Sequence, residues 1–186
     1  FLLHEKIAED FITQFKIAIQ NLKTGDPFEK TTQIGSLARI DLAEELEAQV
    51  QKSMIMGAKL ILGGNRKEAF YEPTILTEVS TEMPVFREET FGPVAAITTF
   101  KTIEEAIELS NRSEFGLGIS IFTQNIAAIK AQISAFSEGA VFINEMVKSD
   151  PRLPFGGIKK SGYGRELAEE GIKEFMNVKT VVINTL

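Results

Sequence analysis

Short apolar runs and helical stretches alternate through the middle of the chain, and this alternation constrains the fold more than any other feature. Residues 94–100, 119–122 and 140–143 are rich in apolar, β-branched and aromatic side chains and predict three strands. A capping box at 102–105 opens one predicted helix, and residues 125–136 predict another. Strands joined through helices by short links are typical of right-handed βαβ units. We therefore predict an α/β fold with a largely parallel sheet.

Further elements flank this region. Apolar residues at helical spacing predict helices over 7–22, 36–56 and 165–176. The inward face of the second helix is expected to carry Leu42, Leu46, Val50 and Met54. Residues 59–62 predict a short strand, and residues 179–184 predict another that has nothing after it to pair with locally. Such a terminal strand often completes a sheet elsewhere, including in another subunit. A length of 186 residues favours one well-packed domain, and no linker marks a second.

The available side chains narrow the chemistry that these residues can support. The chain has no cysteine and one histidine, His4, which excludes disulfides, cysteine metal sites and a thiol nucleophile within it. A formal net charge of −6 argues against nucleic-acid and anionic-membrane partners. No apolar run has the length of a membrane span, and the first residues lack the features of a signal peptide. We expect a soluble cytoplasmic protein with no metal site, and we assign no role to His4.

The segment at 87–94 combines an acidic stretch with an aromatic residue and a fixed backbone. Gly92-Pro93 restricts the chain just after Phe91. Glu89 and Phe91, two residues apart in an extended chain, point to the same side. Together they offer a bidentate acceptor and a flat apolar ring, which suits an aromatic ring joined to a sugar diol. The alternative is a solvated acidic turn before a buried strand.

The segment at 153–167 contains four glycines in a loop before a predicted helix. Glycines there allow a ligand to approach the backbone closely. The pattern is not a dinucleotide fingerprint, because it follows a loop rather than a strand and lacks the third glycine. Simpler interpretations are also open: Glu166 as a first-turn acid favoured by the helix dipole, Phe155 as a core aromatic, and Ser161 as a loop or cap residue.

Two blocks of this sequence strongly resemble signature blocks of the aldehyde dehydrogenase superfamily: EETFGPV at 88–94 and PFGGIKKSGYGREL at 154–167. Shorter matches follow in the family's order along essentially the whole chain, among them GDP at 25–27, YEPT at 71–74, VFIN at 141–144 and KTV at 179–181. The residues VKSDPR at 147–152 most resemble the succinate-semialdehyde dehydrogenase branch. Ser36 departs from the family, in which many members carry proline, but the departure affects only a turn.

The resemblance implies a three-layer αβα lobe of the aldehyde dehydrogenase catalytic-domain type and an NAD(P)+-dependent oxidation of a small aldehyde to the acid. In that family a cysteine thiolate attacks the carbonyl to give a thiohemiacetal, hydride passes to the nicotinamide, and a glutamate-activated water hydrolyses the thioester. Carried over by position, Glu89 would accept the nicotinamide-ribose hydroxyls and Phe91 would lie against the nicotinamide side of NAD or NADP.

The same resemblance gives roles to four residues near the second block. Phe155 would line the aldehyde tunnel, and Glu166 would lie near the water and proton path behind the general base. Ser149 and Arg152 lie in the preceding loop, where the succinate-semialdehyde branch could contact a substrate carboxylate. The assignment of Arg152 rests on its charge alone.

The resemblance also implies how the chain is divided and what lies outside it. Residues 1–177 would form part of the catalytic domain, and residues 178–186 would form a C-terminal oligomerisation strand of a homodimer or homotetramer. The family's cysteine, general base and nucleotide-binding domain would all precede Phe1. We therefore expect an N-terminally truncated fragment that is inactive alone and does not bind NAD or NADP tightly. The alternative is a non-catalytic scaffold or oligomerisation module related to the same enzymes.

Overall fold

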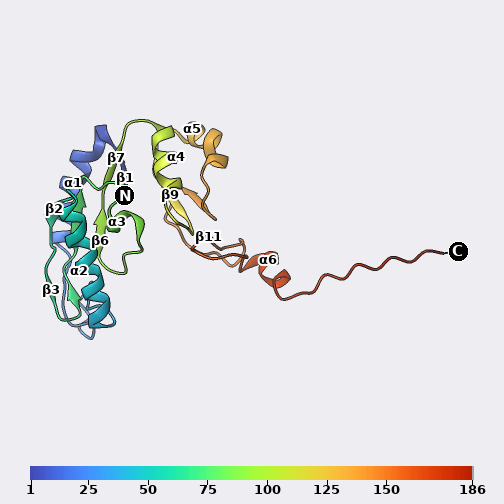
Figure 1. Cartoon of the computed structure of the whole chain (residues 1–186), viewed down its shortest axis with the longest axis horizontal. Coiled ribbons are helices and arrows are strands. Elements are labelled where there is room, and N and C mark those ends of the chain that lie inside the picture. The colour runs from blue at the N-terminus through green and yellow to red at the C-terminus, as the bar shows by residue number, and fades with distance from the viewer. Residues whose placement is uncertain (186) are drawn as a thin grey trace. The chain divides into compact units, whose positions relative to one another are not determined.

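The computed structural model describes residues 1–185 and divides the chain into two compact units, Phe1–Ser113 and the residues from Glu114 onward (Figure 1). The length predicted one well-packed domain, whereas the structure has two units, at a boundary that no linker marks in the sequence. The first unit contains β1 (Leu2–His4), α1 (Glu5–Gln20), α2 (Ile40–Ile55), β2 (Lys59–Leu62), β3 (Arg66–Lys67), β4 (Phe70–Tyr71), β5 (Thr74–Thr77), α3 (Pro84–Arg87), β6 (Val94–Ala96), β7 (Thr98–Phe100) and α4 (Ile103–Asn111). The second contains β8 (Phe115–Gly116), β9 (Ile119–Ile121), α5 (Ile126–Gln132), the 3₁₀ helix η1 (Ile133–Ala135), β10 (Val141–Ile143), β11 (Ile158–Lys159) and α6 (Ala168–Lys173).

The first unit has three layers around the buried strand β5. This strand pairs with β2 in antiparallel and with β6 in parallel orientation. Successive side chains of a strand point to opposite faces, so Ile75 packs with the α1 side and Leu76 with the α2 side. The predicted αβα layering of an α/β fold is therefore confirmed.

Helix α1 confirms the predicted amphipathic helix and begins at Glu5, two residues before the predicted start. His4 precedes it, and its Nδ1 accepts a hydrogen bond from the backbone N–H of Lys6 at 3.2 Å. No role was predicted for His4, whereas in the structure it caps the helix. Rings on the buried side lie close together, with the centroids of Phe11 and Phe15 5.4 Å apart.

Helix α2 confirms the second predicted helix, but it begins at Ile40 and presents a different face. The fully buried positions are Ala43, Leu46, Val50 and Ser53. Leu42 is only half-buried and Met54 is 39% exposed, so the predicted inward face was wrong at these two positions. The apolar pattern pointed to Met54, but Ser53 lies on the same helix face as Ala43, Leu46 and Val50, and its hydroxyl has hydrogen-bond partners although it is buried.

The strand predicted over 94–100 is divided at Ile97 into β6 and β7. Strand β6 pairs with β5, whereas β7 pairs in parallel with β1 at the N-terminal end of the chain. The buried side chain of Ile97 packs with Leu3 and Ile75 at this division. The helix predicted from the capping box follows as α4, and the Thr102 hydroxyl accepts from the Glu105 N–H at 3.3 Å.

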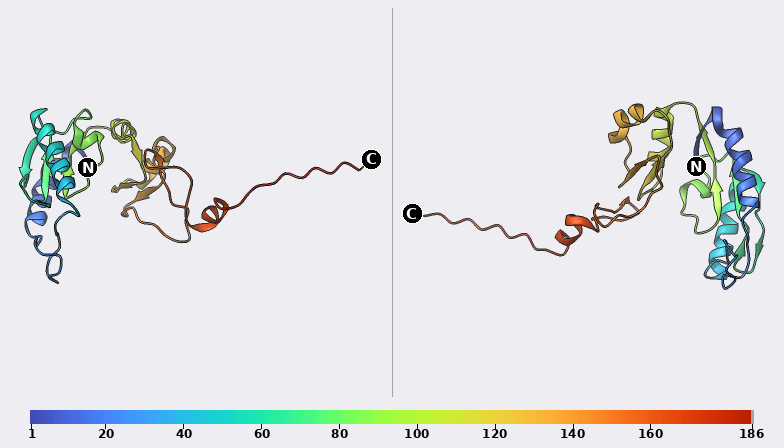
Figure 2. Two further views of the ribbon diagram at one scale, coloured as in Figure 1. Left: turned by 60° about the horizontal axis from the view of Figure 1, so that its bottom comes forward. Right: turned by 180° about the vertical axis from the view of Figure 1, so that it is seen from behind.

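The second unit contains the predicted βαβ arrangement. Strand β9 leads into α5 and η1, and the chain returns as β10 parallel to β9 (Figure 2). The Asn125 side chain caps α5 by accepting from the Ala128 N–H at 3.1 Å. The short strand β11 lies within the glycine-rich segment and pairs with β8 in antiparallel orientation.

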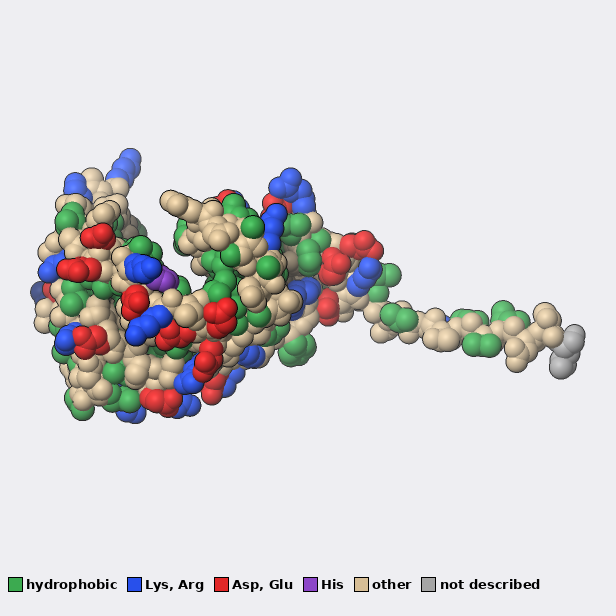
Figure 3. All heavy atoms as spheres, turned by 90° about the horizontal axis from the view of Figure 1, so that it is seen from above, with side chains coloured by type: hydrophobic (Ala, Val, Ile, Leu, Met, Phe, Trp, Pro, Cys, Tyr) green, Lys and Arg blue, Asp and Glu red, His purple; other side chains and the backbone are tan. Residues whose placement is uncertain are grey.

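The last predicted helix is much shorter than expected, because α6 covers only Ala168–Lys173. Its predicted first residues are held in extended conformation by a backbone pair between Phe155 and Glu166. No strand is formed by the described residues after α6, which include the predicted strand at 179–184. Apolar side chains of this extension are exposed (Figure 3).

In the part of the chain that the structure describes, no helix is both long and apolar enough to cross a membrane.

Candidate functional site

The loop at 88–92 presents an acid and an aromatic ring to solvent. It follows α3, whose last turn is closed by the Glu88 N–H bonding to the Pro84 carbonyl at 2.8 Å. The Glu89 side chain is exposed, and no hydrogen bond or ion pair within residues 1–185 engages its carboxylate. The ring of Phe91 is 65% exposed. The loop therefore offers a free bidentate acceptor and a free apolar ring.

Helix α2 holds this loop through a polar residue, Gln49, that no sequence pattern indicates. Gln49 Nε2 donates to Glu88 Oε2 at 3.0 Å and to the Glu89 carbonyl at 3.2 Å. One turn further along, the Ser53 hydroxyl accepts from the Val85 N–H at 3.3 Å at the start of α3. The loop is thus attached to α2, although the side chains of Glu89 and Phe91 are exposed.

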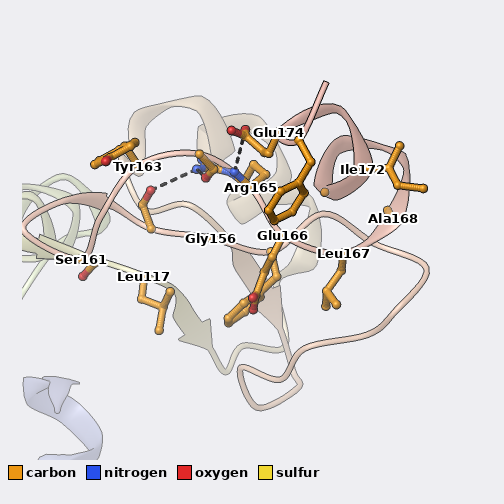
Figure 4. A pocket seen from close by; sticks show the side chains of 15 residues that line it. Leu117, Gly156, Ser161, Tyr163, Arg165, Glu166, Leu167, Ala168, Ile172 and Glu174 are labelled. Atoms are coloured by element: carbon orange, nitrogen blue, oxygen red, sulfur yellow. Dashed lines mark hydrogen bonds between the residues drawn. The ribbon is translucent and has the colours of Figure 1, made fainter. Parts of the chain in front are cut away.

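The second unit contains a cavity of about 560 Å³ between the glycine-rich segment and α6 (Figure 4). Phe155 and Glu166 both line it, and their backbones are joined by two hydrogen bonds of 2.9 and 2.8 Å. The structure therefore brings together these two predicted site residues, which are eleven positions apart in the sequence. The other lining residues are Leu117, Gly156, Gly157, Ser161, Tyr163, Gly164, Arg165, Leu167, Ala168, Gly171, Ile172, Glu174 and Phe175.

Arg165 organises the wall of this cavity. Its Nη1 donates to the Gly157 carbonyl at 3.0 Å and to the Gly164 carbonyl at 2.7 Å. Its backbone N–H donates to Glu174 Oε1 at 3.3 Å, so the loop and the end of α6 are connected (Figure 4). Ser161, interpreted from the sequence as a loop or cap residue, accepts from the Gly116 N–H at 3.0 Å.

Ser149 and Arg152 lie on the loop that precedes Phe155. Both side chains are exposed, and Arg152 is paired with Asp150 through Nε–Oδ1 and Nη2–Oδ2 contacts of 2.9 and 2.7 Å. The Arg152 side-chain and backbone hydrogen bonds lower the pKa of Asp150 to about 2. The positive charge of Arg152 is therefore already balanced, and a substrate carboxylate would have to compete with Asp150 for it. Contact of either residue with a substrate remains a prediction.

No group of three or more histidine, aspartate or glutamate side chains gathers as a metal site among residues 1–185. Besides Arg165, the residues that sequence reasoning missed are Gln49, Ser53 and Asp150. A polar residue among the apolar positions of an amphipathic helix is a signal for Ser53, and the Asp-Pro-Arg spacing is a signal for Asp150. Nothing local in the sequence indicates the partners of Gln49.

Comparison with known proteins places these features in a family. The sequence model of the aldehyde dehydrogenase family matches residues 1–181. The chain is 47% identical over 184 residues to the Escherichia coli succinate semialdehyde dehydrogenase [NAD(P)+] Sad, covering 97% of this chain and 40% of that protein. It is also 47% identical over 186 residues to a probable succinate-semialdehyde dehydrogenase [NADP(+)] of Synechocystis, covering 98% of this chain and 41% of that protein.

Solved structures show the same fold. Succinate-semialdehyde dehydrogenase from Burkholderia pseudomallei matches with a TM-score of 0.89 and 35% identity over 94% of this chain and 37% of that one. Aldehyde dehydrogenase 21 from Physcomitrella patens, in complex with the reaction product succinate, matches with a TM-score of 0.90 and 32% identity over 98% of this chain and 38% of that one. The chain thus spans about two fifths of the length of the curated relatives named above. It belongs to the aldehyde dehydrogenase family.

Proposed function

We propose that this chain is part of an NAD(P)+-dependent enzyme that oxidises succinate semialdehyde to succinate. The observation that carries the proposal is the loop at 88–92, where an unengaged carboxylate and an exposed ring stand two residues apart on a segment fixed to α2. The substrate is suggested by the two relatives at 47% identity, both described as succinate-semialdehyde dehydrogenases.

In this proposal the loop holds the nicotinamide half of NAD or NADP. The Glu89 carboxylate has acceptor capacity for both hydroxyls of a ribose, and Phe91 offers a flat apolar surface for the ring beside it. When bound, the cofactor supplies the hydride acceptor for aldehyde oxidation. The two side chains therefore orient the cofactor and carry out no bond-breaking step themselves.

The cavity of the second unit is proposed to serve the aldehyde. Phe155 would form an apolar wall of the aldehyde path, and the Glu166 carboxylate would lie on the path by which water and protons move. Ser149 and Arg152 would meet the substrate's distal carboxylate. Because Asp150 already binds Arg152, the carboxylate would take over the guanidinium from Asp150 and accept a hydrogen bond from Ser149.

The nucleophile of the proposed mechanism is not among these residues, since the chain has no cysteine. A cysteine that forms a thiohemiacetal with the aldehyde, and a glutamate that activates water, would have to come from polypeptide outside the 186 residues. We accordingly expect the isolated chain to show no aldehyde oxidation and no tight NAD or NADP binding. An isolated chain that oxidises aldehyde would contradict this part of the proposal.

The described residues after α6 are proposed to add a strand to a second copy in a homodimer or homotetramer. Val178, Val181, Val182 and Ile183 are between 70% and 98% exposed and have no strand partner among residues 1–185. Edge pairing would cover these side chains and satisfy the extended backbone. Analytical sizing of the protein with and without residues 178–186 tests this proposal.

The main test is made on the complete protein that carries this chain. Oxidation of succinate semialdehyde is followed through NADH or NADPH absorbance, and the Glu89→Gln variant is compared with the wild type. Loss of a charge-assisted hydrogen bond to a ribose should raise the KM for the cofactor about tenfold or more. Glu104→Gln, an exposed acid of α4, is the control and should behave as wild type. Absence of aldehyde oxidation with both cofactors would refute the proposed function.

A further inference from the structure

The side-chain amide of Gln49 connects α2 to the loop that carries Glu89. Its Nε2 has two N–H groups, and the structure provides two acceptors for them: Glu88 Oε2 at 3.0 Å and the Glu89 carbonyl at 3.2 Å. The acceptors lie 39 and 40 residues away in sequence, so the contact is tertiary. The bond to Glu88 is charge-assisted and therefore stronger than an ordinary amide hydrogen bond.

Two neighbours of Gln49 on α2 hold the ends of the same segment. Ser53 binds the Val85 N–H before the loop, and Leu46 packs so closely against Gly92 after the loop that a Cβ there would overlap it. Positions 46, 49 and 53 share one face of a helix. Of these three attachments, only that of Gln49 reaches the residue whose carboxylate would contact the cofactor.

We infer that Gln49 is a positioning residue for cofactor binding, acting through the backbone of Glu89. This inference rests on the proposed function, in which Glu89 accepts the ribose hydroxyls. The amide holds the Glu89 carbonyl and thereby restricts the backbone position from which the exposed carboxylate reaches the cofactor. The amide also binds the Glu88 carboxylate. This second acid is therefore held on α2 and does not compete with Glu89 for the ribose hydroxyls. The loss of Gln49 should therefore weaken cofactor binding and leave aldehyde binding unchanged.

The decisive variant is Gln49→Glu in the complete protein. It keeps the size of the side chain but replaces the donor with an acceptor that faces Glu88 Oε2 and the Glu89 carbonyl. Gln51→Glu is the matched control, because it adds the same charge to an exposed position of the same helix. Gln49→Met removes the donor without adding charge, and Gln49→Lys restores a donor. We expect Gln49→Glu and Gln49→Met to raise the KM for NAD(P)+ about fivefold or more, with the KM for the aldehyde unchanged. Gln49→Lys should recover most of that loss.

Hydrogen exchange of the amides at 88–94 provides a readout that does not depend on activity. These amides should exchange about fivefold faster in Gln49→Glu than in Gln51→Glu, whether or not the protein oxidises an aldehyde. Equal exchange in the two variants would overturn the inference. A KM that rises equally for cofactor and aldehyde would also overturn it. If the wild type lacks dehydrogenase activity while exchange rises only in the Gln49 variants, the proposed function fails and the attachment of the loop stands.

Discussion

Replacing Ser53 with alanine tests whether α2 holds α3 and the following loop in place. Ser53 is fully buried, and its hydroxyl donates to the Gln49 carbonyl at 2.8 Å and accepts from the Val85 N–H at 3.3 Å. Val85 is in the first turn of α3, where backbone N–H groups have no partner within the helix. Ser53 thus acts as a cap supplied by another helix, and Ser53→Ala leaves this buried N–H without an acceptor.

Two opposing contributions set the size of the effect. An unsatisfied buried donor costs about 1–3 kcal/mol. Alanine is a better helix former than serine and returns about 0.5 kcal/mol in the interior of α2. The hydrogen-bond loss therefore dominates, and we expect a net destabilisation of about 0.5–2.5 kcal/mol.

The measurement is equilibrium urea unfolding of the protein carrying Ser53→Ala, with Ser36→Ala as the control. Ser36 is exposed and lies before α2, so its substitution should change stability by less than about 0.5 kcal/mol. With a slope of about 2 kcal/mol/M, the Ser53→Ala midpoint should fall by about 0.3–1.2 M. An unchanged or higher midpoint would show that the Val85 N–H finds another acceptor, and would refute the capping role.

Two further predictions concern titrating groups. Burial, and then the negative charge of Glu47, raise the pKa of Tyr71 to about 12 from 10.0. The folded state therefore binds the phenol proton more tightly than the unfolded state does. This difference stabilises the folded protein fully below about pH 10, and the stabilisation is lost as pH rises toward 12. Tyr71→Phe should remove that alkaline loss in unfolding measured at several pH values. Arg152→Gln should return the pKa of the Asp150 carboxyl from about 2 toward 3.8, as followed by NMR, because the lowered pKa is caused mainly by the hydrogen bonds from Arg152. The contribution of this exposed pair is present above about pH 4, decreases as pH falls toward 2, and weakens in high salt.

The elements that local patterns determine were predictable. The apolar spacing along α1 and the capping box before α4 depend on residues a few positions apart, and both were located to within about two residues. The parallel return from β9 through α5 to β10 was equally predictable, because a strand and its crossover helix place the next strand beside the first. In each case the information needed is contained within one element or between neighbours in sequence.

The short helix α6 shows why other features were not predictable from periodicity. The residues from Arg165 onward have helical spacing, but the backbone of Glu166 is paired with Phe155. Leu167 and Ala168 then adopt φ values of 65° and 49°, which residues other than glycine rarely adopt. A backbone pairing across the glycine-rich loop thus overrides helix propensity, and no count of apolar residues contains that pairing.

The same distinction between local patterns and tertiary contacts applies to the candidate site. Glu89 and Phe91 stand out because their chemistry is visible in the sequence, whereas Gln49 is one of the two glutamines of α2. The role proposed for Gln49 depends entirely on two acceptors about forty residues away. Arg152 is the opposite case. Its charge led to a predicted role in substrate binding, but in the structure the guanidinium is already paired with Asp150. Chemistry that a residue carries can therefore be read from the sequence, but whether that chemistry is free or engaged is decided by tertiary contacts. This distinction is why the tests of Gln49 and Arg152 change a hydrogen-bond partner and preserve the fold around it.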